Sequence, residues 1–260
     1  MTGFAGVLAI VLAETLAGAA ALTWLSPLWN ETKRSYFTIW SVIAALLFAW
    51  PTWLAARSGA IVGDAAGARV VAAALAVAVV VSLSAALLLA RRQAAGRVVG
   101  IASLPVVLAL LAAMAATGRQ AFAVSAFQLL VGSAFLGSAY GCLFLGHWYL
   151  TDRKLPRRPI ERTTMMLLVA TGLEVIAIVT GGFSGTSASQ EFNPLLTAGA
   201  LAPWIAIGMA AATMLIAGLA RAALRGERAS AVQSATGFYY LAVVTAFTAE
   251  TAVKTRFLPG

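Results

Sequence analysis

The chain has 260 residues, of which 61% are hydrophobic and only 10% charged. A soluble domain carries about 25% charged residues and has no room for this much apolar side chain in one core, so the composition excludes a soluble protein. The net charge of +9 does not indicate nucleic-acid binding, because the basic residues lie in short segments between apolar runs, where insertion topology and anionic lipid headgroups explain them.

Eight apolar segments follow one another along the chain, each long enough to cross a hydrocarbon core about 30 Å thick. They must be helices, because open strands leave backbone groups unsatisfied in lipid, and runs such as Val70–Ala90 are apolar on every face. We therefore expect an all-α integral membrane protein, a bundle of about eight transmembrane helices forming a single polytopic domain, 1–260. The predicted spans are 3–27, 36–56, 69–90, 97–117, 122–150, 163–183, 194–220 and 231–257.

Positive charge is distributed unevenly between the two sets of loops. The loops after the odd-numbered spans hold 13 of the 18 Lys and Arg residues, and the remaining 5 lie on the other side. The positive-inside rule then places both termini outside the cytoplasm, with the protein in the cell (inner) membrane. No Lys or Arg precedes Lys33, so the first span lacks the basic start of a signal peptide and is expected to be retained. The 13 residues are Lys33, Arg34, Arg91, Arg92, Arg97, Arg153, Lys154, Arg157, Arg158, Arg162, Arg221, Arg225 and Arg228.

Three carboxylates lie inside predicted spans: Glu14 in the first, Glu174 in the sixth and Glu250 in the eighth. A charge at the bilayer centre costs about 2.5–3.5 kcal/mol on insertion scales, so such residues are expected to face the bundle interior. They are candidates for a proton relay, an ion site or a ligand-binding group. The alternative is that they are protonated and hydrogen-bond helices together. Lys254 follows Glu250 by one turn and offers it a local ion pair.

The fifth span carries the only histidine, His147, near its predicted cytoplasmic end. Tyr140, Phe144 and Trp148 share a broad helical face with it. This arrangement suits a quinone, whose ring needs aromatic walls and hydrogen-bond donors for its carbonyl oxygens. The alternative is an aromatic belt at the level of the headgroups.

Small residues repeat every four positions on the same span, at Ser133, Gly137 and Gly141. Such a stripe lets a second helix approach closely, so this span is predicted to be central in the bundle. Gln128 on this span is expected to hydrogen-bond between helices.

Two tyrosines, Tyr239 and Tyr240, lie about nine residues inside the eighth span, deeper than an ordinary aromatic belt. Because buried hydroxyls need partners, one of them, Tyr239 or Tyr240, is expected to join Glu174 and His147 in a polar cluster in the cytoplasmic half.

Several chemistries are not expected from this chain. One histidine cannot ligate a b-type haem through two histidines, and one cysteine, Cys142, can form neither an intrachain disulfide nor an iron–sulfur site. No metal site is expected.

Two weaker features concern organisation. Ala-Glu-Thr occurs at 13–15 and at 249–251, and four plus four spans would allow a parallel duplication. The Gly/Ser-rich segment Gly181–Asn193 is expected to be a flexible connector, a lip over a site or a docking point for an extracytoplasmic partner.

Three functions fit these observations. The first is an integral membrane subunit of a redox or respiratory electron-transfer complex, which binds quinone near the cytoplasmic face, relays protons through the buried Glu residues and depends on partner subunits for its redox cofactors. The second is a proton- or cation-coupled transporter. The third is a structural scaffold in which every polar residue serves packing.

Overall fold

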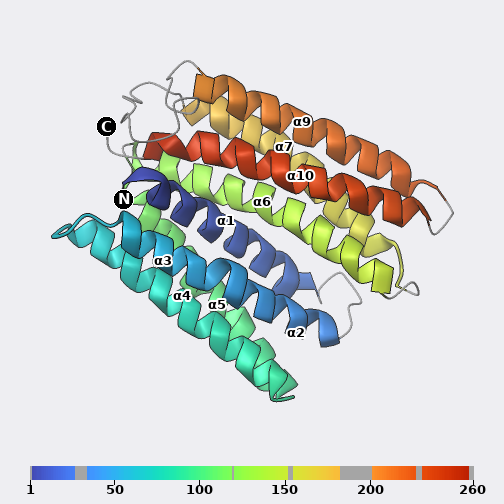
Figure 1. The fold of residues 1–260 in the computed structure, drawn as a ribbon, viewed down its shortest axis with the longest axis horizontal. Helices are drawn as coiled ribbons and strands as arrows, with labels where there is room; N and C mark the ends of the chain where they lie inside the picture. Colours follow the sequence, from blue (N-terminus) through green and yellow to red (C-terminus); the bar gives the residue numbers. More distant parts are fainter. Residues whose placement is uncertain are drawn as a thin grey trace.

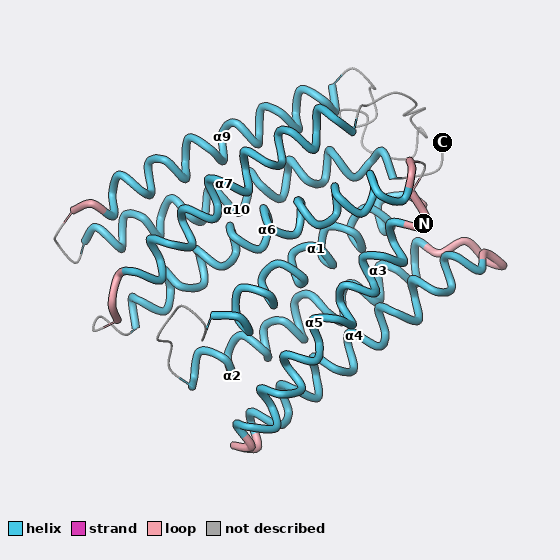
Figure 2. The backbone as a smooth tube through the Cα atoms, turned by 180° about the vertical axis from the view of Figure 1, so that it is seen from behind, coloured by secondary structure: helices cyan, strands magenta, loops and turns pink. Residues whose placement is uncertain are grey.

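The computed structural model describes residues 2–26, 34–118, 120–151, 155–181, 201–226 and 230–257. All regular structure in these ranges is helical, as Figures 1 and 2 show. The helices are α1 (Gly3–Leu25), α2 (Arg34–Ile43), the π-helix η2 (Ala44–Ala49), α3 (Trp50–Gly59), α4 (Ala65–Leu89), α5 (Gln93–Ala115), α6 (Phe122–Thr151), α7 (Arg158–Gly181), α9 (Leu201–Leu224), α10 (Ser230–Lys254) and the short 3₁₀ helix η3 (Thr255–Phe257).

Within the described ranges these helices form eight spans, because α2, η2 and α3 run on as one helix. Seven of the spans are long and apolar enough to cross a membrane. The eighth, α10, has 25 residues but contains more polar side chains. The expected all-α membrane bundle is thus confirmed. The segments 182–200 and 152–154, which include most of the predicted Gly/Ser-rich lip, lie outside the described residues.

The eight spans form two groups of four. The first group contains α1, α2–η2–α3, α4 and α5, and the second contains α6, α7, α9 and α10 (Figure 1). In each group every helix contacts the next one along the chain, and the last contacts the first. The groups meet mainly through α1 and α6. This common order fits a parallel duplication, but the two Ala-Glu-Thr stretches occupy non-equivalent spans, α1 and α10, and give no support to it.

The small-residue stripe lies where α1 and α6 cross. A Cβ atom added at Gly137 would lie 2.3 Å from the carbonyl carbon of Gly18, and one added at Gly18 would lie 1.7 Å from the carbonyl oxygen of Ser133. Neither position therefore has room for a side chain. The predicted close approach at this stripe is confirmed, and its partner helix is α1.

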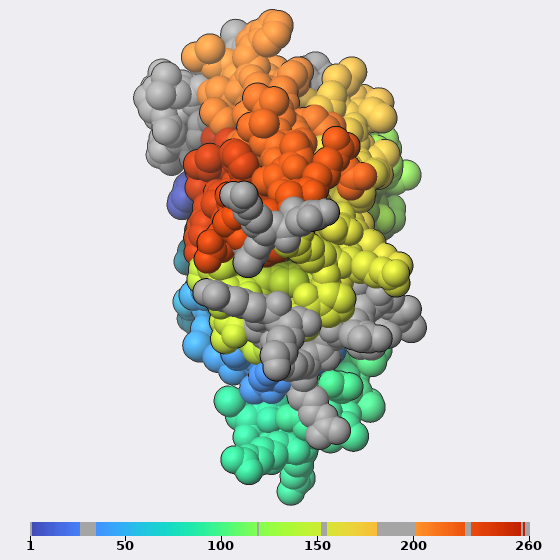
Figure 3. Space-filling model, turned by 90° about the vertical axis from the view of Figure 1, so that its right-hand side faces the viewer, coloured from blue at the N-terminus to red at the C-terminus, as the bar shows by residue number. Residues whose placement is uncertain are grey.

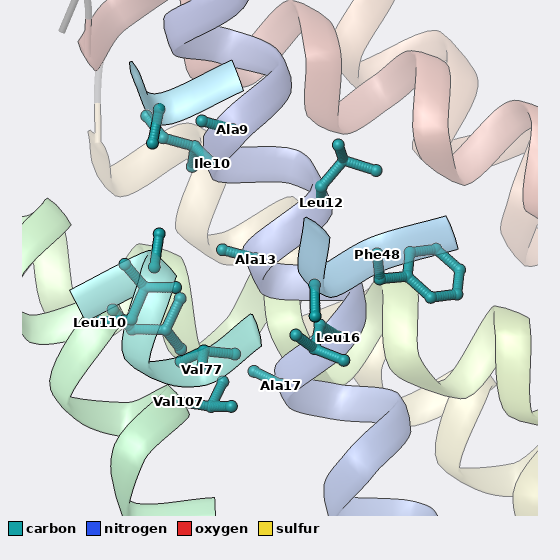
Figure 4. Packing of buried hydrophobic residues seen from close by; sticks show 14 of the residues in the cluster. Ala9, Ile10, Leu12, Ala13, Leu16, Ala17, Phe48, Val77, Val107 and Leu110 are labelled. Carbon is teal, nitrogen blue, oxygen red and sulfur yellow. The ribbon is translucent and has the colours of Figure 1, made fainter. Parts of the chain in front are cut away.

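The opposite face of α1 packs against the other helices of the first group. Figure 4 shows Ala13, Leu16 and Ala17 of α1 beside Val107 and Leu110 of α5. Because α1 is covered on both faces, 78% of its apolar 18-residue stretch is buried. This is the largest share among the seven helices that are long and apolar enough to cross a membrane. A residue halfway along α1 is therefore far from lipid as well as from water.

The two ends of the bundle differ in composition. Both termini lie at one end, which we call the terminal end (Figure 1). At the other end, here called the basic end, lie Arg91, Arg92 and the arginines that flank the α6–α7 and α9–α10 connections. Figure 3 views the basic end and shows an elongated cross-section, with α9 and α10 at one extremity and the α4–α5 turn at the other.

Candidate functional site

Three fully buried ionisable side chains meet inside the bundle. Lys254 Nζ lies 2.8 Å from Glu14 Oε1 and 2.9 Å from Glu250 Oε2. All three side chains have 0% relative exposure. We call these residues the Glu–Lys–Glu group. Its bridge from Lys254 to Glu14 joins α10 of the second group of helices to α1 of the first.

The backbone places this group in three steps. Glu250 and Lys254 are one turn apart on α10, so they share a face. Glu14 lies about halfway along α1 and reaches them across the interface between the two groups. Gly132 of α6 leaves the space that the carboxylates fill, because a Cβ atom there would lie 2.5 Å from Glu14 Oε1 and 3.0 Å from Glu250 Oε1. Any larger residue at Gly132 would collide with both acids.

The remaining surroundings of Lys254 lead toward the terminal end. Its Nζ donates a long hydrogen bond, 3.5 Å, to the backbone oxygen of Gln128, and it lies 5.6 Å from the centre of the Phe257 ring. The Gln128 side chain is buried, and its Nε2 donates to Oε1 of Gln120 at 2.9 Å. Gln120 is half-buried in the connection before α6. Polar side chains thus run from the terminal end of the bundle to the buried group.

The Glu–Lys–Glu group contains two carboxyl groups and one ammonium group, and Lys254 pairs with both acids. Glu174, on α7, is 1% exposed. With every member ionised, the Glu–Lys–Glu group has a net charge of −1 in a medium that stabilises unbalanced charge poorly. Protonation of one carboxyl group would bring this net charge to zero.

Sequence reasoning found the acids of this group and the local pair between Glu250 and Lys254, which is present. It did not anticipate that Lys254, the last residue of α10, is completely buried. The reason is that η3 follows α10 directly and sets the Phe257 ring, itself 6% exposed, close to the ammonium. The bridge to Glu14 and the role of Gly132 depend on helix pairing and were missed.

The aromatic and histidine residues of α6 do not share one surface. His147 Nδ1 lies 3.1 Å from the Tyr240 hydroxyl oxygen, and both side chains are exposed on the side of the bundle. Trp148 packs against Tyr36 of α2 instead, with ring centroids 6.0 Å apart. Tyr140 packs against Phe48 of η2, at 4.9 Å. The aromatic residues of α6 point to different neighbours because α6 lies between α10 and the first group of helices. Quinone binding near His147 stays a prediction.

The polar cluster expected in the cytoplasmic half forms only in part. Tyr240 meets His147, but the Tyr239 hydroxyl lies 2.6 Å from Thr164 Oγ1. Thr164 precedes Glu174 by ten residues of α7, which is about 15 Å along the helix. The Tyr239 hydroxyl therefore lies nearer the basic end than Glu174, and its hydrogen-bond partner is Thr164.

Metal ligands do not gather in the described ranges. No group of three or more His, Cys, Asp or Glu side chains there is arranged to hold a metal ion. Cys142 is buried and unbridged.

Comparison with protein-family models, with curated proteins and with solved structures gives no match to this chain. The functional argument therefore depends on the geometry of the Glu–Lys–Glu group and of its surroundings.

Proposed function

We propose that this chain is a proton-coupled membrane transporter whose proton-binding element is the Glu–Lys–Glu group. The observation that carries the proposal is the bridge between Lys254 and Glu14, a fully buried ion pair between the two groups of helices. Buried ionisable residues in a membrane bundle are expensive and are used chiefly in ion pathways and proton relays.

The energetics of buried ion pairs favour a role in proton exchange over a role in packing. Replacing a buried ion pair by apolar residues of similar volume is often neutral or stabilising, so packing alone does not call for these side chains. A group with two acids and one ammonium gains from binding a proton and returns to its ion-paired form on losing it. The same residues thereby offer a protonated state and an ion-paired state.

Protonation would act on the contact between the two groups of helices. A neutral Glu14 holds Lys254 less tightly, so the link across the interface between α1 and α10 weakens when the proton binds. Rocking of one helix group against another around a central site is a common form of alternating access. The ion pair thus couples proton binding to movement of the groups.

Polar side chains approach the group from one side and a groove approaches it from the other. Gln120 and Gln128 lead to it from the terminal end, which the positive-inside rule assigns to the outside of the cell. On the basic side, Ala17 and Ser133 line the inner end of a lateral groove and lie within one turn of Glu14 and Gly132. A small displacement of helices would open the group in that direction.

The redox reading of the sequence remains the second candidate. It would use the same carboxylates to pass protons, but it also needs an enclosed place for a quinone ring. The His147–Tyr240 pair lies on an exposed side of the bundle, so the geometry favours the transporter.

Flux measurements on the isolated chain test the proposal. Proteoliposomes loaded with a pH-sensitive dye are exposed to a panel of organic acids, amino acids, sugars and cations under a proton gradient. We expect solute-dependent proton movement with the wild-type chain and a loss of at least about tenfold in Glu14→Gln and Glu250→Gln, since each removes one proton site.

The matched control is Asp64→Asn. Asp64 caps α4 at the terminal end by accepting hydrogen bonds from the N–H groups of Ala66 and Gly67. Asparagine keeps one of the two acceptor oxygens and is among the preferred N-cap residues. This control should move protons as the wild type does. Equal flux in all four proteins, or no flux with any solute, would contradict the proposal.

A further inference from the structure

A lateral groove opens on the bundle where the two groups of helices meet. Its volume is about 920 Å³, and residues of α1, α5, α6 and α7, with Arg221 of α9, line it. The residues at the floor of the groove have small side chains: Ala17 and Ala21 of α1 and Ala134 of α6. The hollow therefore results from small residues on the two central helices.

The lining of the groove favours an apolar ligand. Ser133 and Ser138 are its hydroxyl residues, and their Oγ atoms donate to carbonyl oxygens of their own helix, at 2.7 and 2.6 Å. Their hydrogen-bonding capacity is thus largely satisfied within α6. Met165 and Val169 of α7 form part of the outer rim and are 41% and 58% exposed. Such a surface suits a hydrocarbon chain.

The depth of the groove matches one leaflet of a bilayer. Along α7 it runs from Arg162 to Leu173. Eleven residues of helix rise about 16 Å, which is close to half of a hydrocarbon core about 30 Å thick. The groove begins at the basic end and finishes near the middle of the bundle.

Positive charge gathers where the groove reaches the basic end. Arg162 of α7 and Arg221 of α9 line it there together with Glu161. Arg225 lies one turn beyond Arg221 and borders an adjoining hollow of about 230 Å³. Among the described residues that line the two hollows, three carry guanidinium groups and one carries a carboxylate. Guanidinium forks match the oxygens of a phosphate, so this lining favours an anionic headgroup.

We propose that this groove binds an anionic phospholipid from the leaflet at the basic end. Its phosphate lies at Arg162 and Arg221, and an acyl chain fills the hollow between the two groups of helices. The lipid acts as a wedge beside the α1–α6 crossing. This binding site stands independently of the proton-binding role of the Glu–Lys–Glu group.

Native mass spectrometry of the full chain in mild detergent tests this site. The chain is titrated with phosphatidylglycerol and, separately, with phosphatidylethanolamine of the same acyl composition. We expect one phosphatidylglycerol to bind more tightly than phosphatidylethanolamine. In Arg162→Gln/Arg221→Gln its affinity should fall about 30-fold, which corresponds to about fivefold for each arginine near the surface.

The matched control is Arg91→Gln/Arg92→Gln, which removes two exposed arginines at the same end but away from the groove. Its phosphatidylglycerol affinity should equal that of the wild type. A third variant, Ala134→Leu, fills the floor at a membrane-exposed position and should weaken both lipids alike.

Three results would overturn the proposal. The first is equal binding of the two lipids to the wild type. The second is an equal loss of affinity in both double-arginine variants. The third is a chain that purifies as a lipid-free dimer or with a neutral quinone retained in the groove, because either shows that another molecule occupies it.

Discussion

At the scale of single residues, the Glu–Lys–Glu group balances two acids against one ammonium. Lys254 touches both carboxylates within 3 Å, and none of the three side chains is exposed. Removal of one partner from a buried ion pair leaves an uncompensated charge, which costs about 3–5 kcal/mol. The contribution of each of the three residues to the stability of the protein should therefore depend strongly on the other two.

Lys254→Met should accordingly destabilise the protein by about 3–5 kcal/mol, measured as denaturant-induced unfolding in detergent. Neutralising the acids as well, in Lys254→Met/Glu14→Gln/Glu250→Gln, should recover most of the loss. If the single variant is as stable as the wild type, or if the triple variant is no more stable than the single one, Lys254 does not neutralise this pair.

Gly132 provides an independent test of the same packing. Gly132→Ala places a methyl group 2.5 Å from Glu14 Oε1 and should cost about 1–3 kcal/mol, as overpacking does. Combination with Glu14→Asp, which shortens the acid by one methylene, should return part of this loss. The control is Gly218→Ala, because a Cβ atom there has no neighbour within 4 Å. Equal thermal stability of Gly132→Ala and Gly218→Ala would show that the site is roomier than described.

Sequence reasoning reaches only part of this site. The cost of burying a carboxylate in a membrane span marks Glu14, Glu174 and Glu250 from composition alone. Lys254 lies near a predicted helix end, where cations are common, so nothing in the sequence indicates that it is buried. Gly132 is one of 23 glycines in the chain, and its importance depends on a clash with side chains of two other helices.

At the scale of the helices, α1 and α6 determine how the two groups pack. The backbones approach so closely at Gly18 and Gly137 that neither residue can carry a Cβ atom without displacement. In lipid, where the hydrophobic effect between helices is weak, such close packing and buried polar contacts hold helices together. The ion pair between Glu14 and Lys254 lies on the same interface, one turn from Gly18 along α1.

Gly137→Ala should therefore push α6 away from α1 and lower the melting temperature by about 5 °C or more, since overpacking against backbone relaxes poorly. A cysteine pair engineered across the interface should also crosslink less efficiently in this variant. Gly237→Ala on α10, where a Cβ atom meets nothing within 4 Å, is the control and should behave as the wild type. A stable, normally crosslinked Gly137→Ala protein would argue against the tight crossing.

Helix positions were largely predictable, but helix partners were not. Long apolar runs marked every span, and α6 was expected at 122–150 and extends over Phe122–Thr151. At α7 the helix begins at Arg158 rather than 163, because Pro159 is tolerated within the first helical turn. The stripe of small residues predicted a close neighbour for α6. It did not say that the neighbour is α1, because many helices of this chain carry alanine and glycine.

At the scale of the whole molecule, two groups of four helices share the same order of neighbouring helices and meet mainly through α1 and α6. The polar contacts on that interface are therefore well placed to control how the groups move. The proposed lipid lies on the same interface from the basic end, and the polar side chains of Gln120 and Gln128 reach it from the terminal end.

The prediction at this scale concerns the orientation of the chain in the membrane. Val62 lies at the terminal end and is fully exposed, whereas Arg92 lies at the basic end. Because the basic end should face the cytoplasm, Val62→Cys should react with a membrane-impermeant maleimide in intact cells, and Arg92→Cys should react only after permeabilisation. The native Cys142 is buried and should contribute little background. The reverse labelling pattern would contradict this orientation and, with it, the side from which protons enter.

The central claim is that the two acids of the Glu–Lys–Glu group hold an exchangeable proton. Infrared spectroscopy of the reconstituted chain near neutral pH tests it most directly, through the carbonyl band of a protonated carboxyl group and its shift in heavy water. We predict such a band in the wild type and in Asp64→Asn, and its loss in Glu14→Gln/Glu250→Gln. Absence of the band in the wild type, or a band that disappears only in Glu174→Gln, would contradict the claim.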